Sequence, residues 1–276
     1  MHPFSFIINI ILCKGLQAEG FAGAKEVQRM NYYDTPIAHR GLHGSNGIIE
    51  NTTSAFKLAI EKGYTIELDV KLLKDGKAVV FHDANLKRLL GKNVPISRLT
   101  SQDLEKEEYR FPNGEKIPTL EEVVALIDGR VKLLVELKSF TLTSRKLEQA
   151  TYDAIKGKDW IFVQAFNPYT IMWFEKNAPE VTRGILATVA KNVFMQIGYY
   201  IANPDKMIAQ AKPHFIAFEV KYMPSEKIEK LVKEYDAKYL AWTVKTKEDE
   251  AVARECGVDQ IIFESIDPSE WFKASE

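Results

Sequence analysis

Side chains capable of acid–base or metal chemistry stand beside short apolar runs between Ile37 and Asp83. Runs of this kind predict buried strands. A polar residue that closes a buried strand must find a partner or take part in chemistry, because leaving it unpaired in apolar surroundings costs about 1–3 kcal/mol. Several such residues occur in this stretch, and together they predict a functional site: His39, Arg40, Glu67, Asp69 and His82.

The pair Asp75-Gly76 predicts a hairpin with a two-residue loop, since glycine accepts the positive φ that a type I′ turn needs. With that loop Asp69 lies opposite His82, and cross-strand partners share a face of the sheet. Glu67 points to the same face, because it lies two residues before Asp69. The hairpin is therefore expected to bring these three side chains together. The alternatives are a register displaced by one residue, or a surface hairpin with a chance His–Asp pair.

A second pair of polar residues closes a later apolar run, at Glu136 and Lys138. They are two positions apart, as Glu67 and Asp69 are, so each pair projects to one face of its strand. Three carboxylates in one confined space repel each other, and a hard divalent cation such as Mg²⁺ or Ca²⁺, which prefers oxygen ligands, removes that penalty. We predict that Glu67, Asp69 and Glu136 bind one divalent cation. The alternative is that one or more of them forms an ion pair with Arg40 or Lys138.

His39 and His82 are the histidines placed to face each other across this site. Near neutral pH an imidazole can give or take a proton, so a facing pair can supply both a general base and a general acid. Their positions at strand ends beside acids favour catalysis over a packing role.

The elements that position these residues follow from the pattern of the whole chain. Nine apolar runs predict strands at Pro36–Arg40, Tyr64–Lys71, Ala78–Phe81, Lys132–Leu137, Trp160–Ala165, Thr182–Leu186, His214–Phe218, Tyr239–Val244 and Gln260–Phe263. Amphipathic stretches between them predict helices at Thr53–Lys62, Leu120–Ile127, Ser144–Ile155, Pro168–Asn177, Pro204–Ala211, Ser225–Tyr235 and Lys247–Glu255. Such alternation is typical of βαβ units with a parallel sheet.

Nine strands do not close an eight-stranded barrel, and the hairpin accounts for the extra one. Strands joined by two residues must be antiparallel, because a parallel neighbour needs a long crossover. Ala78–Phe81 is therefore an excursion from the second strand. The remaining eight predict an α/β fold, a (β/α)8 TIM barrel over residues 31–276, with a small insertion after the second barrel strand at about 84–118. In such a barrel the functional residues lie at the carboxyl ends of the strands.

Net charge and cysteine content argue against several kinds of binding site. A formal net charge of −1 gives no general attraction to nucleic acid or to anionic membranes, so any phosphate binding must come from local charges. The two cysteines, Cys13 and Cys256, have no C-x-x-C spacing, which argues against a zinc site or a disulfide framework. Nothing in the sequence predicts the oligomeric state.

Residues 1–30 are expected to be an N-terminal extension, for which three interpretations remain open. The apolar run Phe4–Leu12 is too short to span a bilayer and has no Lys or Arg ahead of it, although Ala22-Gly23-Ala24 resembles a signal cleavage site. The extension is an export signal, a packing segment, or an upstream addition to a protein that starts at Met30. The sequence favours a cytoplasmic location, with secretion or membrane association through residues 1–24 as the alternative.

The motifs resemble, in order, the signature of the glycerophosphodiester phosphodiesterase family. They are His39-Arg40-Gly41, Glu50-Asn51-Thr52, Glu67-Leu68-Asp69-Val70, Asp75-Gly76, His82-Asp83, Glu136-Leu137-Lys138, Gln164-Ala165-Phe166 and Trp242-Thr243-Val244. The resemblance spans about Pro36 to Asp267. The sequence departs from the family pattern at Ile49, where Pro is usual, at Phe263-Glu264, where Thr-Asp is usual, and at Lys245, where Asn is common.

The resemblance implies a metal-dependent enzyme that hydrolyses glycerophosphodiesters, small-molecule substrates, to glycerol 3-phosphate and an alcohol. A glycerol hydroxyl of the substrate would attack phosphorus in line, with His39 as base and His82 as acid, or with the two roles exchanged. Arg40 and Lys138 would balance the phosphate charge.

Three further residues are expected to contribute to the site, the first by resemblance and the other two by their positions in the sequence. Trp242 resembles the tryptophan with which the family contacts substrate, and a core aromatic is the alternative. Glu50 is expected to support the site next to Arg40. Asn51 is expected to shape its loop through helix capping, and either Asn51 or Thr52 can cap the helix that follows.

Two other functions remain open. A related barrel phospholipase, lysophospholipase D-like or forming a cyclic phosphate, would act on a lipid and would need an exposed apolar rim. The insertion or Phe4–Leu12 could provide that rim. The second alternative is a non-catalytic barrel that binds phosphodiesters. Contact with a membrane is not indicated by the sequence, and a nucleic-acid partner is not expected.

Overall fold

The computed structural model describes residues 32–44, 47–189 and 204–272. The predictions for residues 1–30, including the export signal and the apolar run at Phe4–Leu12, fall outside the described residues.

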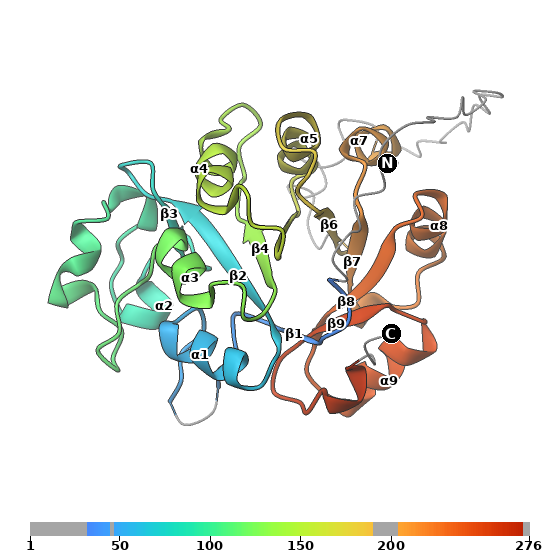
Figure 1. Ribbon diagram of the computed structural model, residues 1–276, viewed down its shortest axis with the longest axis horizontal. Coiled ribbons are helices and arrows are strands. Elements are labelled where there is room, and N and C mark those ends of the chain that lie inside the picture. The colour runs from blue at the N-terminus through green and yellow to red at the C-terminus, as the bar shows by residue number, and fades with distance from the viewer. Residues whose placement is uncertain (1–31, 45–46, 190–203, 273–276) are drawn as a thin grey trace, which may run out of the picture. The chain divides into compact units, whose positions relative to one another are not determined.

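Eight parallel strands in the described ranges form a closed barrel (Figure 1). They are β1 (Ile37–Ala38), β2 (Thr65–Leu72), β4 (Leu133–Leu137), β5 (Ile161–Ala165), β6 (Arg183–Ala187), β7 (Phe215–Glu219), β8 (Lys238–Val244) and β9 (Gln260–Phe263). Each strand pairs with the next in this order, and β1 closes the ring because it pairs with both β2 and β9. The predicted (β/α)8 barrel is confirmed.

Helices lie between the strands along the chain and outside the ring of strands (Figure 1). They are α1 (Thr53–Glu61), α3 (Leu120–Ile127), α4 (Lys146–Ile155), α5 (Pro168–Asn177), α7 (Pro204–Ala211), α8 (Glu226–Glu234) and α9 (Lys247–Glu255). The helices α1, α3, α5 and α9 each begin after a residue whose side chain accepts a hydrogen bond from the first turn. The hydroxyl of Thr119 accepts a hydrogen bond from the backbone N–H of Glu122, whose side chain bonds back to the N–H of Thr119. Thr52, and not Asn51, caps α1.

The ninth strand, β3 (Ala78–Val80), pairs antiparallel with β2 as expected, but the predicted register was wrong by one residue. Leu72 lies opposite Ala78, and the loop closes between Leu73 and Lys77 with Gly76 at φ +85°. This is a three-residue loop with glycine in the left-handed position, which the pair Asp75-Gly76 also allows. Asp69 therefore lies opposite Phe81, not His82.

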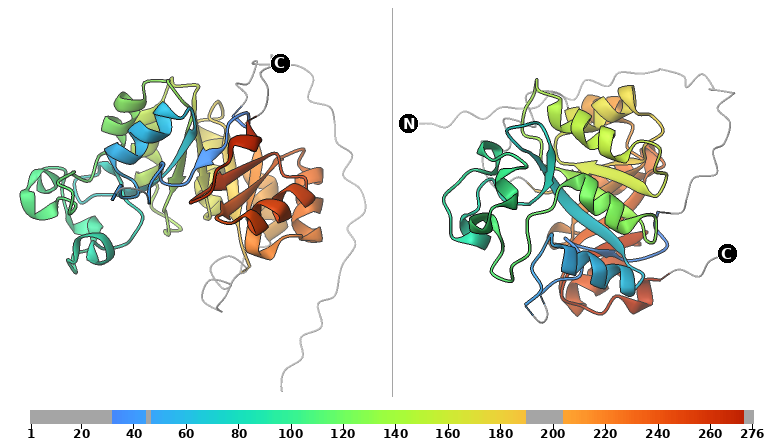
Figure 2. Two further views of the ribbon diagram at one scale, coloured as in Figure 1. Left: turned by 90° about the horizontal axis from the view of Figure 1, so that it is seen from below. Right: turned by 60° about the vertical axis from the view of Figure 1, so that its left-hand side comes forward.

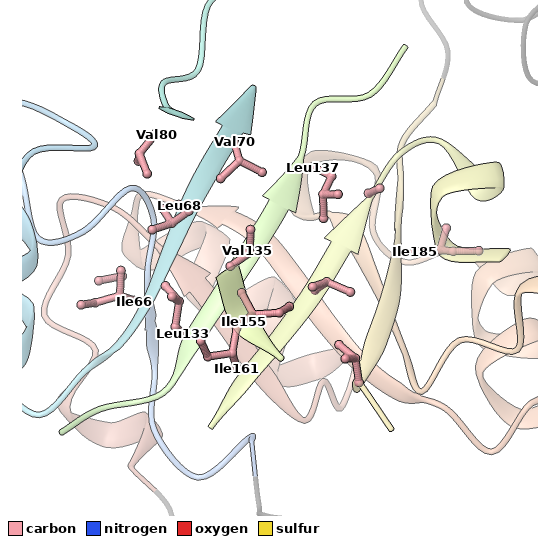
Figure 3. Packing of buried hydrophobic residues seen from close by; sticks show 14 of the residues in the cluster. Ile66, Leu68, Val70, Val80, Leu133, Val135, Leu137, Ile155, Ile161 and Ile185 are labelled. Atoms are coloured by element: carbon pink, nitrogen blue, oxygen red, sulfur yellow. The ribbon is translucent and has the colours of Figure 1, made fainter. Parts of the chain in front are cut away.

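Side chains of the barrel strands alternate between two apolar cores. The outer core lies between strands and helices and contains the residues labelled in Figure 3, such as Ile66, Leu68 and Val135. The inner core fills the barrel with side chains from the other face of every barrel strand except β2: Ile37, Leu134, Phe162, Leu186, Phe215, Leu240 and Ile262. Tyr32, Tyr33 and Ala217 join it. The alternation means that a residue two positions beyond an inner-core residue also faces the barrel interior.

Residues 84–118 leave the barrel after β3 and contain α2 (Lys87–Leu90) and three short 3₁₀ helices, η1 (Ile96–Arg98), η2 (Asp103–Glu105) and η3 (Glu107–Tyr109). They lie to one side of the strands, in green-cyan in Figure 2. An apolar cluster joins this segment to the hairpin, since it contains Leu86 and Phe111 of the segment and Phe81 of the hairpin. Two further 3₁₀ turns, η4 (Val220–Tyr222) and η5 (Ser269–Trp271), follow β7 and β9.

None of the helices within the described ranges is long and apolar enough to cross a membrane.

Candidate active site

Polar residues replace the apolar inner layer at the carboxyl ends of the strands. His39 comes two residues after the inner-core Ile37, Glu136 two after Leu134, and Glu264 two after Ile262. Each of these side chains therefore faces the same interior as the apolar residue below it. Gln164, Thr188, Glu219 and Trp242 follow the same rule on β5, β6, β7 and β8. The mouth of the barrel is a polar layer on an apolar floor.

The three predicted acidic ligands meet in this layer. Glu67 and Asp69 on β2 are fully buried, Glu136 on β4 is nearly so, and a carboxylate oxygen of each lies within 4.8 Å of the others. Asp69 and Glu136 are neighbours because β2 and β4 pair in that register. The Oε1 atom of Glu67 is buried without a hydrogen-bond partner. A buried carboxylate oxygen without a donor, beside two further carboxylates, fits a hard divalent cation.

Two cations also reach this cluster, so the ion pairs considered as an alternative are present as well. Lys138 Nζ lies 2.8 Å from Asp69 Oδ1 and also bonds Glu136, while Arg40 Nε lies 3.1 Å from Asp69 Oδ2. Asn51 Nδ2 donates to the second oxygen of Asp69 at 2.9 Å. Asn51 thus holds a carboxylate in place and does not cap the helix.

The three carboxyl groups differ in charge state. Burial opposes ionisation of Asp69, but Lys138 and then Arg40 outweigh it and hold the pKa of Asp69 well below its usual range. Burial, followed by repulsion from Asp69 and Glu136, raises the pKa of Glu67 well above its usual range. Burial also raises the pKa of Glu136, against the attraction of Lys138. Without a cation the site therefore keeps Asp69 ionised and opposes ionisation of the other two.

Both histidines are held at Nδ1 by a carboxylate. His39 Nδ1 lies 2.9 Å from Glu264 Oε2, and His82 Nδ1 lies 2.7 Å from Asp83 Oδ1. Since an ionised carboxylate only accepts hydrogen bonds, each Nδ1 donates and Nε2 is left free to accept or deliver a proton. Both rings are near enough to Asp69 to help lower its pKa, after the larger contributions of Lys138 and Arg40. Burial lowers the pKa of each imidazole below its usual value.

An arginine of the insertion ties together the supports of the site. Arg88 on α2 bonds Asp83 through Nε at 2.7 Å, and bonds both oxygens of Glu50 at 2.6 and 2.8 Å. Glu50 in turn lies 2.8 Å from Arg40 Nη1. One guanidinium therefore braces the carboxylate behind His82 and the carboxylate behind Arg40.

The loop after β1 takes a left-handed turn at the site. Arg40 has φ +57° and Gly41 has φ +77°. This turn lets the backbone N–H of Arg40 donate to Glu67 Oε2 at 2.9 Å, and the N–H of Gly41 donate to the carbonyl of Glu67 at 3.1 Å. A positive φ costs a non-glycine residue about 1–3 kcal/mol, and such strain concentrates at functional sites.

Trp242 on β8 is half-buried and packs on the inner core. Its Nε1 donates to the carbonyl of Ala217 at 3.0 Å, and its ring meets Phe166 edge to face with centroids 5.4 Å apart. The ring position is thereby set by Ala217 on β7 and by Phe166, the residue that follows β5.

Exposed apolar side chains gather in two loops that follow barrel strands. Phe140 (77% exposed) and Leu142 (63%) follow β4, and Val189 (50%) follows β6. These loops leave the carboxyl ends of their strands, the same end of the barrel at which the polar layer lies. Among the described residues the other large exposed apolar side chain is Phe272.

Sequence reasoning gave no role in the site to five residues that the structure places in it or behind it. Asp83, Arg88 and Glu264 bond predicted residues or their supports, Lys245 bonds Glu264, and Gln164 lies next to Glu136 in the strand register. Asp83, Gln164 and Glu264 stand in or beside the motifs and could have been found by extending the two-residue alternation along each strand. Arg88 offered no signal, because it lies in a polar insertion whose folding direction no periodicity predicts.

Comparison with known proteins identifies the family. A family model for the glycerophosphoryl diester phosphodiesterase family matches residues 39–268. A glycerophosphodiester phosphodiesterase of Caldanaerobacter subterraneus subsp. tengcongensis is 33% identical over 237 residues, 82% of this chain and 92% of the relative. A lysophospholipase D of Rattus norvegicus is 44% identical over 73 residues, 26% of this chain and 23% of the relative.

The fold has solved counterparts too. An Oleispira antarctica phosphodiesterase, in complex with the product sn-glycerol-3-phosphate, matches with a TM-score of 0.68 at 23% identity, over 84% of this chain and 94% of that one. Barrel, site and relatives define the class of protein, a (β/α)8-barrel phosphoric diester hydrolase. Within that class, the chain belongs to the glycerophosphoryl diester phosphodiesterase family.

Proposed function

We propose that this protein hydrolyses glycerophosphodiesters to glycerol 3-phosphate and an alcohol, with one divalent cation and two catalytic histidines. The observation that carries the proposal is the pairing of a buried three-carboxylate cluster with two imidazoles that each keep Nε2 free. The family membership and the named activity of the Caldanaerobacter relative support the substrate class.

The cation site is formed by Glu67, Asp69 and Glu136. A bound Mg²⁺ or Ca²⁺ would supply positive charge next to the phosphate and lower the cost of negative charge that develops during displacement. Lys138 and Arg40, which already contact Asp69, are placed to bind phosphate oxygens that approach the cluster.

Proton transfer falls to the histidines. His39 accepts the proton of the glycerol hydroxyl at Nε2 as that oxygen bonds phosphorus, and His82 gives a proton to the alcohol oxygen as its bond to phosphorus breaks. The resulting cyclic phosphate is opened by water with the roles reversed, so one water is consumed and both histidines return to their starting states. Glu264 and Asp83 stabilise the two imidazolium forms through Nδ1. The roles of the two histidines in the first step can also be exchanged.

The proposal is tested with purified protein and glycerophosphocholine. We expect turnover with added Mg²⁺ or Ca²⁺, loss on chelation and recovery on adding the ion back. His39→Ala and His82→Ala each reduce kcat by about 10²–10⁴-fold, the usual contribution of one general acid or base. Glu175→Gln, in an ion pair with Lys212 remote from the histidines, is the matched control and keeps full activity. An absence of turnover with Mg²⁺, Ca²⁺ and Mn²⁺ would favour a non-catalytic phosphodiester-binding barrel.

A second candidate is a lysophospholipid-cleaving activity of the same site. The exposed side chains of Phe140, Leu142 and Val189 favour it, because an acyl chain leaving the site would find apolar contacts on these loops. The local similarity to a lysophospholipase D points in the same direction.

Direct comparison of glycerophosphocholine with lysophosphatidylcholine separates the two candidates. If the lipid is the substrate, the double variant Phe140→Ser/Leu142→Ser raises KM for lysophosphatidylcholine and leaves KM for glycerophosphocholine unchanged. If both KM values stay unchanged, the apolar rim has no role in catalysis. Product analysis also shows whether the cyclic phosphate is released or opened.

A further inference from the structure

A glutamate and a lysine on neighbouring strands form a row with His39. Glu264 Oε2 lies 2.9 Å from His39 Nδ1, and Glu264 Oε1 lies 3.1 Å from Lys245 Nζ. Each carboxylate oxygen therefore has its own cationic or imidazole partner. In the chain these two residues stand at positions where the sequence departs from the family pattern, and in the structure they are partners of each other.

Strand order explains why the three residues meet. Barrel strands β8, β9 and β1 are consecutive neighbours, and each is followed at its carboxyl end by one of the three: Lys245, Glu264 and His39. The backbone N–H of Glu264 donates to the carbonyl of Val244 at 2.9 Å, and the N–H of His39 donates to the carbonyl of Phe263 at 3.0 Å. The row is thus bonded through main chain as well as side chains.

The burial and the hydrogen bonds of Glu264 determine its charge state. Its side chain is 20% exposed, whereas that of Lys245 is 51% exposed. The hydrogen bond from His39 is the largest influence on Glu264 and lowers its pKa to about 2, so the carboxylate is ionised at neutral pH. An ionised acceptor at Nδ1 keeps the proton of a neutral ring on that nitrogen and leaves Nε2 bare, the form a general base needs.

We propose that Glu264 is the positioning residue of His39 and that Lys245 holds Glu264 in place for this task. The inference rests on the proposed function for the role of His39, but the arrangement of the ring does not. Glu264 itself touches no reacting atom and acts through the orientation and tautomer of the imidazole. The matching support on the other histidine is Asp83, held by Arg88.

Other charged groups also influence the pKa of His39, and the test must leave these residues unchanged. Arg40, from the same strand end, and Asp69, from β2, influence the ring in opposite directions, and His43 lies within the same cluster of nitrogen and oxygen atoms. Burial is the largest influence on the pKa of His39 and lowers it, while Glu264 raises it. A variant that removes only the charge of Glu264 therefore lowers the pKa of His39 further.

The first test is Glu264→Gln, which keeps the size of the side chain and removes its charge. We expect the pKa of the His39 ring, measured by NMR titration without substrate, to fall by about one pH unit. In the pH profile of kcat/KM, the midpoint of the limb that reports His39 moves to lower pH by the same amount. We also expect kcat to decrease about tenfold or more at neutral pH. An unchanged ring pKa, an unchanged pH profile, or a uniform loss of activity without movement of the limb overturns the proposal.

Lys245 is tested by charge rescue. Lys245→Met lowers kcat a few-fold and Lys245→Arg restores it, because the arginine can still hold Glu264. The control is Lys212→Met, which removes a lysine of similar exposure from its pair with Glu175 and changes neither kcat nor the ring pKa. Equal activity of Lys245→Met and Lys245→Arg overturns the part assigned to Lys245.

The NMR titration separates this inference from the proposed function. If the protein turns over no glycerophosphodiester but Glu264→Gln still lowers the pKa of His39, the function fails and the positioning role stands. If turnover is found and the pKa does not move, the positioning role fails alone.

Discussion

At the scale of single residues, the site separates three carboxyl groups that look equivalent in the sequence. Asp69 has Lys138, Arg40 and Asn51 around it, whereas one oxygen of Glu67 has no donor. The unpartnered oxygen of Glu67 is where a cation has most to add, because burying that charge without a counter-ion is costly.

Glu67→Gln tests this difference. We expect affinity for Mg²⁺ or Ca²⁺, measured by isothermal titration calorimetry, to fall by about tenfold or more, with kcat/KM falling in parallel. The folded protein without cation loses no stability, because the variant removes a carboxyl group whose charge is disfavoured by burial. Glu219→Gln is the control, since Glu219 lies in the same polar layer but bonds Thr188 and lies outside the cluster. Equal affinity in the Glu67 variant would place the cation elsewhere.

At the scale of elements, two loops do the positioning: the turn after β1 and the insertion after β3. In the turn after β1, the backbone N–H of Arg40 donates a hydrogen bond to Glu67. In the insertion, the side chain of Arg88 donates hydrogen bonds to Asp83 and Glu50. Both segments are hydrogen-bonded to residues of the site, so we expect substitutions that disturb them to reduce activity.

Gly41→Ala tests the turn after β1. A Cβ there would lie 2.9 Å from the Cβ of Ala55 on α1, in addition to the cost of its φ of +77°. Gly44→Ala is the matched control, with φ +90° and nothing within 4 Å. We expect both variants to lose about 1 kcal/mol or more of unfolding free energy from the backbone conformation, and Gly41→Ala to lose clearly more and to lose activity. Equal losses in chemical denaturation would mean that α1 moves aside without effect.

Arg88→Met tests the brace from the insertion. The variant removes the hydrogen bonds to both Asp83 and Glu50, so we expect kcat/KM to fall about tenfold. The change in melting temperature is small because Arg88 is 46% exposed. Lys92→Met, in the same insertion and paired with Glu108 at 3.6 Å, serves as the control and retains activity. Wild-type kcat/KM in Arg88→Met would show that the insertion does not organise the site.

At the scale of the whole barrel, the buried acids couple stability to pH and to the cation. Glu67 has a raised pKa in the folded state, so its contribution to stability is complete below its ordinary value of 4.5 and is lost as pH rises through the folded value. A bound cation removes that loss, because it favours the ionised form.

The expected result is a melting temperature that responds more strongly to the cation as pH rises. At a fixed concentration of Mg²⁺ or Ca²⁺, the gain increases as pH rises above about 5, because the cation competes with the proton on Glu67. Where that concentration is a hundred times the Kd, the gain is about 2.7 kcal/mol. Differential scanning calorimetry with and without chelator measures the gain. In Glu67→Gln the dependence of this gain on pH becomes weaker. A gain that is constant over this range would contradict the raised pKa.

The strands could be predicted from the sequence more accurately than the loops that connect them. Ile37, Leu134 and Ile262 could be assigned to strands, and the acids two positions apart to one face, because alternation along a strand is a local property. The same reasoning gave the wrong hairpin register, because Asp75-Gly76 is compatible with both a two-residue and a three-residue loop. Only the cross-strand hydrogen bonds, such as Phe81 N–H to the Asp69 carbonyl, decide between them.

The sequence by itself determined the barrel, the order of its strands, and the residue types gathered at their carboxyl ends, since these follow from periodicity, chain order and motifs. The tertiary structure alone decided which carboxylate supports which histidine, that Arg88 braces two of the supports, and that Lys245 and Glu264 are partners. Those contacts join residues up to 225 positions apart, as in His39–Glu264, and depend on barrel closure and loop conformation. No local pattern encodes them, because each depends on where another part of the chain has already folded.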